Sequence, residues 1–199
     1  MTSEVLDSQM KSNYMSALYT AHTTLQLMTS SPLPSHSPRR HLIFTASVLS
    51  FVSLAGYGPY SPAKAALRCL ADTLRQECLL HDIDVHCCFP ATIYSPGFEF
   101  EQSVKPALTK KLEESDPGQT PEEVARACIT SLERGHKMIA TSLIGKALQA
   151  TAWGGSQRNN AFLDTLWIWA VSVIWLFVGW DMDRTVRKWG KENGFRGST

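Results

Sequence analysis

Three side chains in the first third of the chain could together transfer a proton to a carbonyl group. Tyr60 and Lys64 are four residues apart, so on a helix they lie on one face, one turn from each other. An ammonium group in that position lowers the pKa of a phenol from about 10 toward neutrality. Ser47, thirteen residues before Tyr60, could hold a carbonyl oxygen against the same phenol. These residue types predict a proton-donating site for carbonyl reduction.

The segments around these residues predict how they are positioned. Residues 42–46 form a short apolar run that is typical of a buried parallel strand. Ser47 follows at its carboxyl end, where open α/β sheets place their ligands. Two glycines and a proline at residues 56–59 predict a turn before the helix that begins near Tyr60. Residues 83–89 predict the next strand.

The rest of the first 150 residues alternates between helix and strand signals. Apolar residues recur at helical spacing over residues 10–28, and three prolines indicate a loop at 29–40. A Thr-Pro-Glu-Glu sequence at 120–123 is a capping box that starts a helix. Residues 138–141 predict an edge strand. This alternation favours an α/β fold with a parallel sheet.

The spacing of Ser47, Tyr60 and Lys64 resembles the catalytic triad of the short-chain dehydrogenase/reductase family. Asn13, which opens a helix two elements earlier, looks like the Asn that completes the family's catalytic tetrad. The apolar strand that leads into Pro90 resembles the family's strand that reaches the nicotinamide side of the cofactor. These matches cover the second half of the family's domain.

A further segment narrows the resemblance to one branch of the family. Residues 90–98 are similar to a segment of the 3-ketodihydrosphingosine reductases, which act in sphingolipid synthesis. The apolar, Trp-rich C-terminal segment also fits that branch. The resemblance covers roughly residues 10–190.

The resemblance implies a role for each residue. Tyr60 would donate the proton to a ketone oxygen while NADPH delivers a hydride to the carbon. Lys64 would depress the pKa of Tyr60 and bind the nicotinamide ribose, and Ser47 would position the carbonyl. Asn13 would hold a water that links Lys64 to solvent. The residues implied to bind the cofactor are Tyr60, Lys64, Pro90, Ala91, Ile93 and Ser95.

The sequence contains no glycine-rich nucleotide-binding turn. In the family such a turn precedes a helix that binds the pyrophosphate, and the residues before Asn13 are too few for a βαβ unit of about 30 residues. Residues 1–152 are therefore expected to form a partial, Rossmann-like, doubly wound parallel sheet without its N-terminal nucleotide-binding half. An exposed apolar strand edge would result, so the isolated chain is expected to fold poorly or associate.

The C-terminal segment differs in character from the rest. Residues 161–180 carry no charge apart from Asp164 and contain four tryptophans, which suits a membrane interface. A hydrophobic helix buried against the domain or a dimer partner is the alternative. Residues 181–199 form a basic tail, which favours a cytosolic location. A single span would separate this tail from a cytosolic catalytic domain, and a re-entrant or interfacial helix would resolve that conflict.

Composition excludes several other classes of function. The formal net charge of +1 gives no nucleic-acid-binding signal. The five cysteines and six histidines show no metal-ligand spacing, so no metal site is expected, and an odd cysteine count without a signal peptide suggests reduced thiols facing the cytosol.

These observations lead to one main hypothesis and two alternatives. The main hypothesis is an NADPH-dependent oxidoreductase at the endoplasmic reticulum membrane, with its catalytic part facing the cytosol. It would reduce the 3-keto group of a long-chain sphingoid substrate, and it could form a homo-oligomer through the helix of Tyr60. The first alternative is a reductase of another lipid or steroid ketone. The second is a catalytically inactive, membrane-attached interaction module.

Overall fold

The structure is a computed structural model that describes residues 2–30, 38–114, 116–154 and 157–193. Its centre is a parallel sheet of three strands, in the order β1 (Arg40–Thr45), β2 (Ile83–Phe89) and β3 (Met138–Ala140). All three strands were predicted from the sequence, and the bounds of β2 match the prediction. The sequence also predicts a loop at residues 29–40. Residues 31–37 of this range lie outside the described part.

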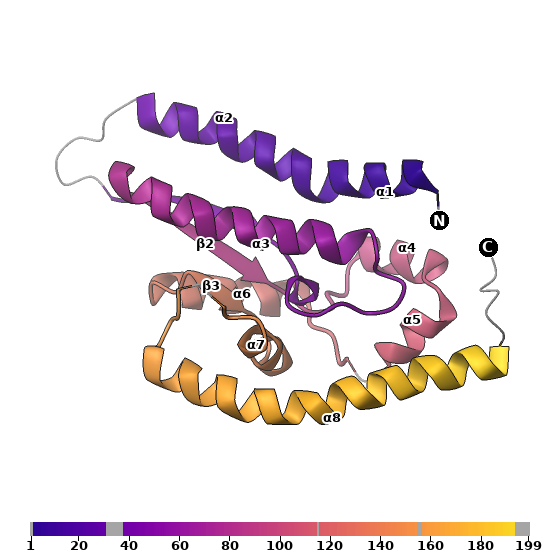
Figure 1. Cartoon of the computed structure of the whole chain (residues 1–199). Helices are drawn as coiled ribbons and strands as arrows, with labels where there is room; N and C mark the ends of the chain where they lie inside the picture. Colours follow the sequence, from indigo (N-terminus) through magenta and orange to yellow (C-terminus); the bar gives the residue numbers. More distant parts are fainter. Residues whose placement is uncertain (1, 31–37, 115, 155–156, 194–199) are drawn as a thin grey trace.

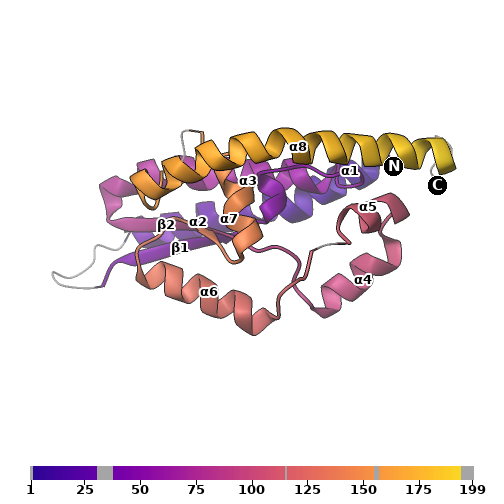
Figure 2. The same cartoon turned by 90° about the horizontal axis from the view of Figure 1, so that it is seen from below.

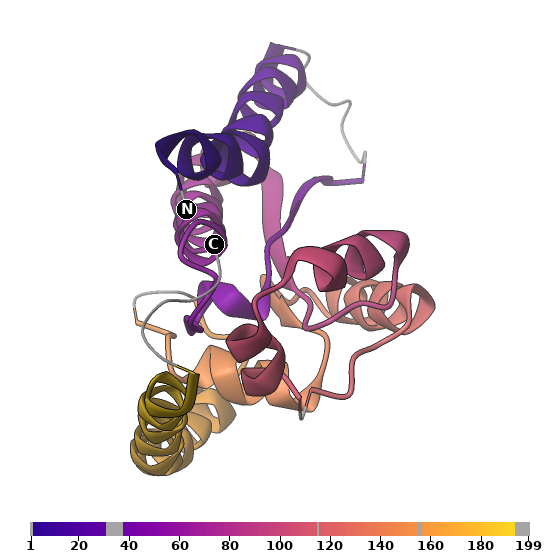
Figure 3. The ribbon, with the colours of Figure 1, turned by 90° about the vertical axis from the view of Figure 1, so that its right-hand side faces the viewer.

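Helices cover both faces of the sheet (Figures 2 and 3). The N-terminal rod consists of α1 (Ser3–Met10), a π-helical turn (Lys11–Met15) and α2 (Ser16–Ser30), and it runs alongside α3 (Tyr60–Glu77) in Figure 1. Helix α3 packs on one face of β2, and α6 (Pro121–Glu133) lies on the opposite face. Because both faces of β2 are covered, nearly every side chain of this strand is buried.

The core lies between α3 and the sheet. Its centre is formed by large side chains that are almost fully buried, among them Phe89, Leu67 and Val85. The apolar stripe of the N-terminal rod packs against the same cluster, with Ala21 buried and Leu25 half-buried. Truncation of one large core side chain of this kind costs about 3–5 kcal/mol of stability.

Strand β1 forms one edge of the described sheet and has one exposed face. The side chains of His41, Ile43 and Thr45 alternate with the buried or half-buried Leu42 and Phe44. The exposed face of this edge strand is mixed, with the apolar side chain of Ile43 between those of His41 and Thr45.

Several short elements connect the strands and helices near the carboxyl end of the sheet. A 3₁₀ turn (Val48–Ser50) follows β1, and α4 (Pro96–Val104) and α5 (Ala107–Leu112) follow β2. Helix α6 starts with the predicted capping box, in which Thr120 and Glu123 exchange side-chain-to-backbone hydrogen bonds. Helix α7 (Leu143–Ala150) follows β3.

The C-terminal segment is one long helix, α8 (Ala161–Asn193), that lies along the side of the domain (Figure 1). It begins where the sequence predicts it but does not end at residue 180. The basic segment from residue 181 continues the same helix, supported by an ion pair of 3.5 Å between Arg187 and Asp183 one turn away. Residues 194–199 lie outside the described part. Among the described helices, α8 is long and apolar enough to cross a membrane.

Candidate active site

The carboxyl ends of β1 and β2 bring Ser47 next to Pro90. Pairing continues beyond both strands, because the backbone N–H of Ala46 donates to Cys88 O at 2.8 Å and that of Val48 donates to Pro90 O at 3.0 Å. Ser47 caps the following 3₁₀ turn, since its Oγ accepts a hydrogen bond from Leu49 N at 3.2 Å. This local structure fixes Ser47 at the edge of the sheet where parallel strands place ligands.

A glycine turn places Tyr60 at the first position of α3. Gly56 has φ +99°, and a Cβ at this position would collide with the hydroxyl of Thr109. That hydroxyl donates to Ala55 O at 2.9 Å, which ties the turn to α5. The N–H of Tyr60 then donates to Tyr57 O at 3.0 Å, and α3 begins. The glycine is needed here because backbone and a buried side chain approach each other closely.

Tyr60 lies in a largely buried environment that keeps it protonated. Burial raises the pKa of Tyr60 above its usual value, a hydrogen bond with Ser47 opposes this, and the negative charge of Glu101 raises the pKa further. The sequence led us to expect that Lys64 lowers the pKa of this phenol, but in the structure the pKa of Tyr60 is raised, because burial outweighs the lowering by Ser47.

Lys64 lies over the ring of Tyr60 rather than beside its hydroxyl. Its Nζ is 5.5 Å from the ring centroid and donates a hydrogen bond to Thr45 O at 3.3 Å. Burial lowers the pKa of Lys64, which makes its ammonium group easier to deprotonate. Ser47, Tyr60 and Lys64 thus meet in one place.

The three residues line a cleft with a volume of about 1060 Å³. The cleft also contains all four further residues that the sequence assigned to the cofactor, which are Pro90, Ala91, Ile93 and Ser95. Asn13 does not line it. The amide of Asn13 donates to the backbone oxygen and the Oε1 of Gln9, at 3.1 and 2.8 Å, within a π-helical turn that packs against α3. Such turns often occur at functional sites.

The segment after β2 is held in place by its own hydrogen bonds. Thr92 and Tyr94 pair with the backbone of Gln119 at 2.8 and 2.9 Å, in a short parallel bridge. Ser95 caps α4, because its Oγ accepts a hydrogen bond from Phe98 N at 3.3 Å. The hydroxyl predicted to face a cofactor therefore also starts the helix that forms the opposite wall of the cleft.

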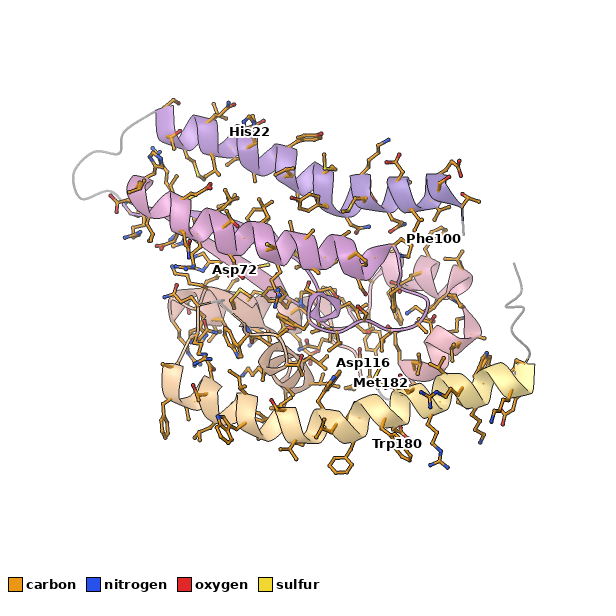
Figure 4. All side chains as sticks on the ribbon, viewed as in Figure 1. His22, Asp72, Phe100, Asp116, Trp180 and Met182 are labelled. Atoms are coloured by element: carbon orange, nitrogen blue, oxygen red, sulfur yellow. The ribbon has the colours of Figure 1, made fainter. Side chains whose placement is uncertain are left out.

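Helix α8 supplies an apolar wall of the cleft. From the sequence, this helix was expected to meet a membrane, the domain or a dimer partner. Residues on its inner face line the cleft, whereas Trp180 points away from the domain in Figure 4 and is 62% exposed. Met182, also on α8, lies near Asp116 in the same view, and both line the cleft. The apolar residues of α8 in the wall are Trp167, Val171, Ile174, Trp175, Phe177, Val178 and Met182.

A charged cluster at the other end of the cleft was missed by the sequence analysis. Lys105 Nζ lies 2.5 Å from Glu113 Oε2 and 3.0 Å from Glu101 Oε1, and Tyr57 donates to the same Oε1 at 2.6 Å. The Lys105 side chain is only 3% exposed and also lies over the rings of Tyr57 and Phe98. The one available signal was the i, i+4 spacing of Glu101 and Lys105, which usually marks an exposed helix pair.

The electrostatics of this cluster follow from its burial. Burial disfavours the charge on Lys105, but its hydrogen bonds with Glu113 and Glu101 outweigh this and raise its pKa. Burial and the same two carboxylates raise the pKa of Tyr57 far above its usual value. Lys105 therefore stays charged, and Tyr57 stays a hydrogen-bond donor.

Comparisons with known proteins identify the family of the chain. The chain matches the short chain dehydrogenase family over residues 1–104, which is more than half of its length. It therefore belongs to the short-chain dehydrogenase/reductase family, as its triad spacing indicated.

Its relatives include fungal proteins named 3-ketodihydrosphingosine reductase. The protein of Aspergillus fumigatus is 45% identical over 95% of this chain and 56% of its own length. Those of Neurospora crassa and Cryptococcus neoformans are each 44% identical, over 81% and 86% of this chain and 45% and 50% of their own lengths. The chain spans about half the length of the curated relatives it matches.

Solved structures share the fold. A short chain dehydrogenase from Burkholderia cenocepacia, solved in complex with NADP, has a TM-score of 0.58 at 20% identity, covering 74% of this chain and 55% of its own. A 3-hydroxyacyl-CoA dehydrogenase type-2 from Mycobacterium avium has a TM-score of 0.57 at 20% identity, covering 71% and 57%. At this identity the likeness establishes the Rossmann-like fold.

Proposed function

We propose that this chain carries the catalytic residues of an NADPH-dependent reductase that converts 3-ketodihydrosphingosine to dihydrosphingosine in sphingolipid biosynthesis. The observation that carries the proposal is the convergence of Ser47, Tyr60 and Lys64 on one cleft with an apolar wall. The relatives that bear this reductase name, at up to 45% identity, support the choice of substrate.

The residues at the carboxyl ends of β1 and β2 fit the nicotinamide end of such a cofactor. Pro90, Ala91, Ile93 and Ser95 line the cleft beside the triad, so they would hold this end. The bound cofactor supplies a hydride to the ketone carbon. We assign no residue of this chain to its pyrophosphate, because the sequence contains no glycine-rich turn.

The chain's own residues would handle the proton. Tyr60, which burial keeps protonated, would donate from its hydroxyl to the ketone oxygen as negative charge develops there. Ser47 would hold that oxygen by a hydrogen bond, and Lys64 would stabilise the phenolate left behind and bind the ribose hydroxyls. Asn13 would help resupply the proton through a water. In this role its amide would exchange its present bond to Gln9 for one to that water.

The apolar part of the cleft suits the alkyl chain of a long-chain lipid. Helix α7 contributes Ile144, Ala147 and Leu148, and α8 faces them across the cleft. A lipid chain in this space would be removed from water, at a gain of about 0.8 kcal/mol for each buried CH₂ group.

We further propose that α8 attaches the protein to the endoplasmic reticulum membrane as an interfacial helix, with the cleft on the cytosolic side. The inner face of α8 lines the cleft, whereas large apolar residues such as Trp169 and Leu176 are more than 70% exposed. A helix that serves the cleft with one face and lipid with the other fits the plane of the interface. We also propose that the protein forms a homo-oligomer through α3, the helix of Tyr60.

The test is ketone-dependent oxidation of NADPH by the full-length protein in detergent or vesicles. With 3-ketodihydrosphingosine we expect NADPH consumption matched by dihydrosphingosine formation, and slower turnover with NADH. Faster turnover of a steroid or retinoid ketone would transfer the proposal to another lipid ketone. No turnover of any ketone, in a protein that is shown to be folded, would refute the reductase function and favour an interaction module.

A further inference from the structure

The charged cluster of Tyr57, Glu101, Lys105 and Glu113 takes no part in the proton transfer proposed above. It lies in the same cleft as the catalytic residues, and the ring centroids of Tyr57 and Tyr60 are 5.7 Å apart. Oε1 of Glu101 accepts a hydrogen bond from Tyr57, whose ring lies beside that of Tyr60. A group bound to Glu101 would therefore lie next to the reacting carbonyl.

One carboxylate oxygen in this cluster is available to a ligand. Tyr57 Oη and Lys105 Nζ both contact Oε1 of Glu101, at 2.6 and 3.0 Å. The other oxygen, Oε2, takes part in no hydrogen bond or ion pair with the described residues. The side chain of Glu101 is 45% exposed, compared with 16% for Glu113 and 3% for Lys105. Glu101 is thus held firmly by one oxygen while the other can receive a donor.

The charge of the cleft favours a cation at this point. One ammonium group, that of Lys105, is shared between two carboxylates, so the cluster carries an excess negative charge. Around the whole cleft, five carboxylates face three lysines; the carboxylates are Glu101, Glu113, Glu114, Asp116 and Asp181. A carboxylate with this surplus of negative neighbours gains from a positively charged ligand.

The two ends of the cleft match the two ends of an amphiphile. The substrate of the proposed function, 3-ketodihydrosphingosine, carries an amine on the carbon next to its ketone and a long alkyl chain on the other side. With the ketone at Tyr60, the alkyl chain would extend toward α7 and α8. The amine would then lie toward α4, where Glu101 stands.

We propose that Glu101 binds the ammonium group of the amino ketone through Oε2, and that Tyr57 and Lys105 hold Glu101 in position. This rests on the proposed function and specifies how the enzyme selects its substrate. A ketone without the amine would leave the carboxylate unpaired and would bind less well. Glu101 is then a specificity-determining residue, and Tyr57 and Lys105 are positioning residues.

The test compares Glu101→Gln with Glu99→Gln in the full-length protein. Glu99 lies on the same helix, is exposed and does not line the cleft, so its variant controls for loss of charge on α4. The two substrates are 3-ketodihydrosphingosine and the same chain without its amine, 1-hydroxyoctadecan-3-one. Because a hydrogen bond to a charged group is worth about 1.5–3 kcal/mol, we expect Glu101→Gln to raise KM for the amino ketone about 10- to 100-fold. In Glu101→Gln, KM for the amine-free ketone should stay unchanged. In Glu99→Gln, KM should stay unchanged for both ketones.

A binding measurement gives a readout that is independent of turnover. Trp167 and Trp175 line the cleft, so dihydrosphingosine should change the tryptophan fluorescence when it binds. The affinity should fall about 10- to 100-fold in Glu101→Gln and recover in part in Glu101→Asp. Lys105 keeps its 2.5 Å partner Glu113 in both variants, so each is expected to fold.

The outcomes separate the inference from the function. If wild-type enzyme reduces both ketones with equal KM, or if Glu101→Gln weakens both substrates alike, the assignment of Glu101 is wrong while the reductase function stands. Turnover of neither ketone by the wild-type enzyme would refute the function, and unchanged dihydrosphingosine affinity in Glu101→Gln would then refute the binding role as well.

Discussion

The two walls of the cleft differ in how the chain builds them. The catalytic wall, named for the proposed role of its residues, comes from one continuous strand–turn–helix segment, in which Ser47 follows β1 and Tyr60 begins α3. The opposite wall combines α4 and α5 with α8, which is distant from them in sequence and meets them through contacts such as that of Lys111 with the ring of Trp189. The first wall carries chemistry in residues at fixed spacing, and the second carries shape and charge in residues with no motif.

The difference shows that a catalytic motif and its substrate-binding wall impose different constraints on a sequence. The triad needs its hydroxyls and amine at defined offsets, because strand and helix geometry convert those offsets into distances. The other wall needs only an apolar surface and a correctly placed charge. Mutations on the two walls should therefore have different signatures.

The largest difference should come from the two neighbouring tyrosines. Replacement of Tyr60 by Phe removes the proton donor, so we expect kcat to fall about 10²- to 10⁴-fold. Replacement of Tyr57 by Phe removes the same hydroxyl group from the turn before α3, where it orients Glu101 on the opposite wall. We expect an effect of about 10-fold, mostly on KM. Steady-state kinetics of the full-length variants measure both, and equal losses of kcat would contradict the division between the walls.

Stability should depend strongly on Lys105. Lys105→Met leaves Glu101 and Glu113 without their shared cation, and we expect the free energy of unfolding to fall by about 3 kcal/mol. Lys110→Met, on exposed α5 surface nearby, is the control and should change it by less than about 0.5 kcal/mol. Urea unfolding of both variants measures the difference. A neutral effect of Lys105→Met would mean that the cluster is solvated rather than buried.

The pH dependence should connect the two walls. Burial, and after it Glu101, raises the pKa of Tyr60, and ketone reduction needs the protonated hydroxyl. Activity should therefore persist below this pKa and be lost as the pH rises through it. Removal of the charge in Glu101→Gln lowers the pKa, so the alkaline limb of the kcat profile should move to lower pH. Glu99→Gln should leave the limb in place; a shift toward higher pH in Glu101→Gln would show that Glu101 does not act on Tyr60.

The smallest effect should come from a helix that belongs to neither wall. Thr120→Ala removes the cap of α6, which covers the sheet, and should cost about 1 kcal/mol of stability. The kinetic constants should remain those of the wild type. A change in kcat would show that α6 transmits strain to the catalytic wall through the bridge of Gln119 with Ile93.

Local patterns were enough to predict the strands, the helix of Tyr60 and the capping box of Thr120. The family resemblance added Pro90, Ala91, Ile93 and Ser95, which the structure gathers with the triad in one cleft, and Asn13, which does not line it. Two features of the structure differ from the interpretation of the sequence, namely the pKa of Tyr60 and the residue at which α8 ends. Tyr60 has a raised pKa, because burial and Glu101 act on it, and α8 continues through the basic segment, because i, i+4 ion pairs support the helix beyond residue 180.

The sequence by itself indicated the class of chemistry, since Tyr60 and Lys64, four residues apart, share one face of a helix and Ser47 follows a predicted strand. Only the tertiary structure decided that α8 lines the cleft with one face and that Glu101 stands opposite the catalytic tyrosine. An apolar helix has the same sequence pattern whether it contacts lipid, a core or a substrate. An i, i+4 Glu–Lys pair likewise has the same spacing whether it is exposed or buried. The partner that each surface meets is set by contacts between distant segments, and local spacing carries no information about them.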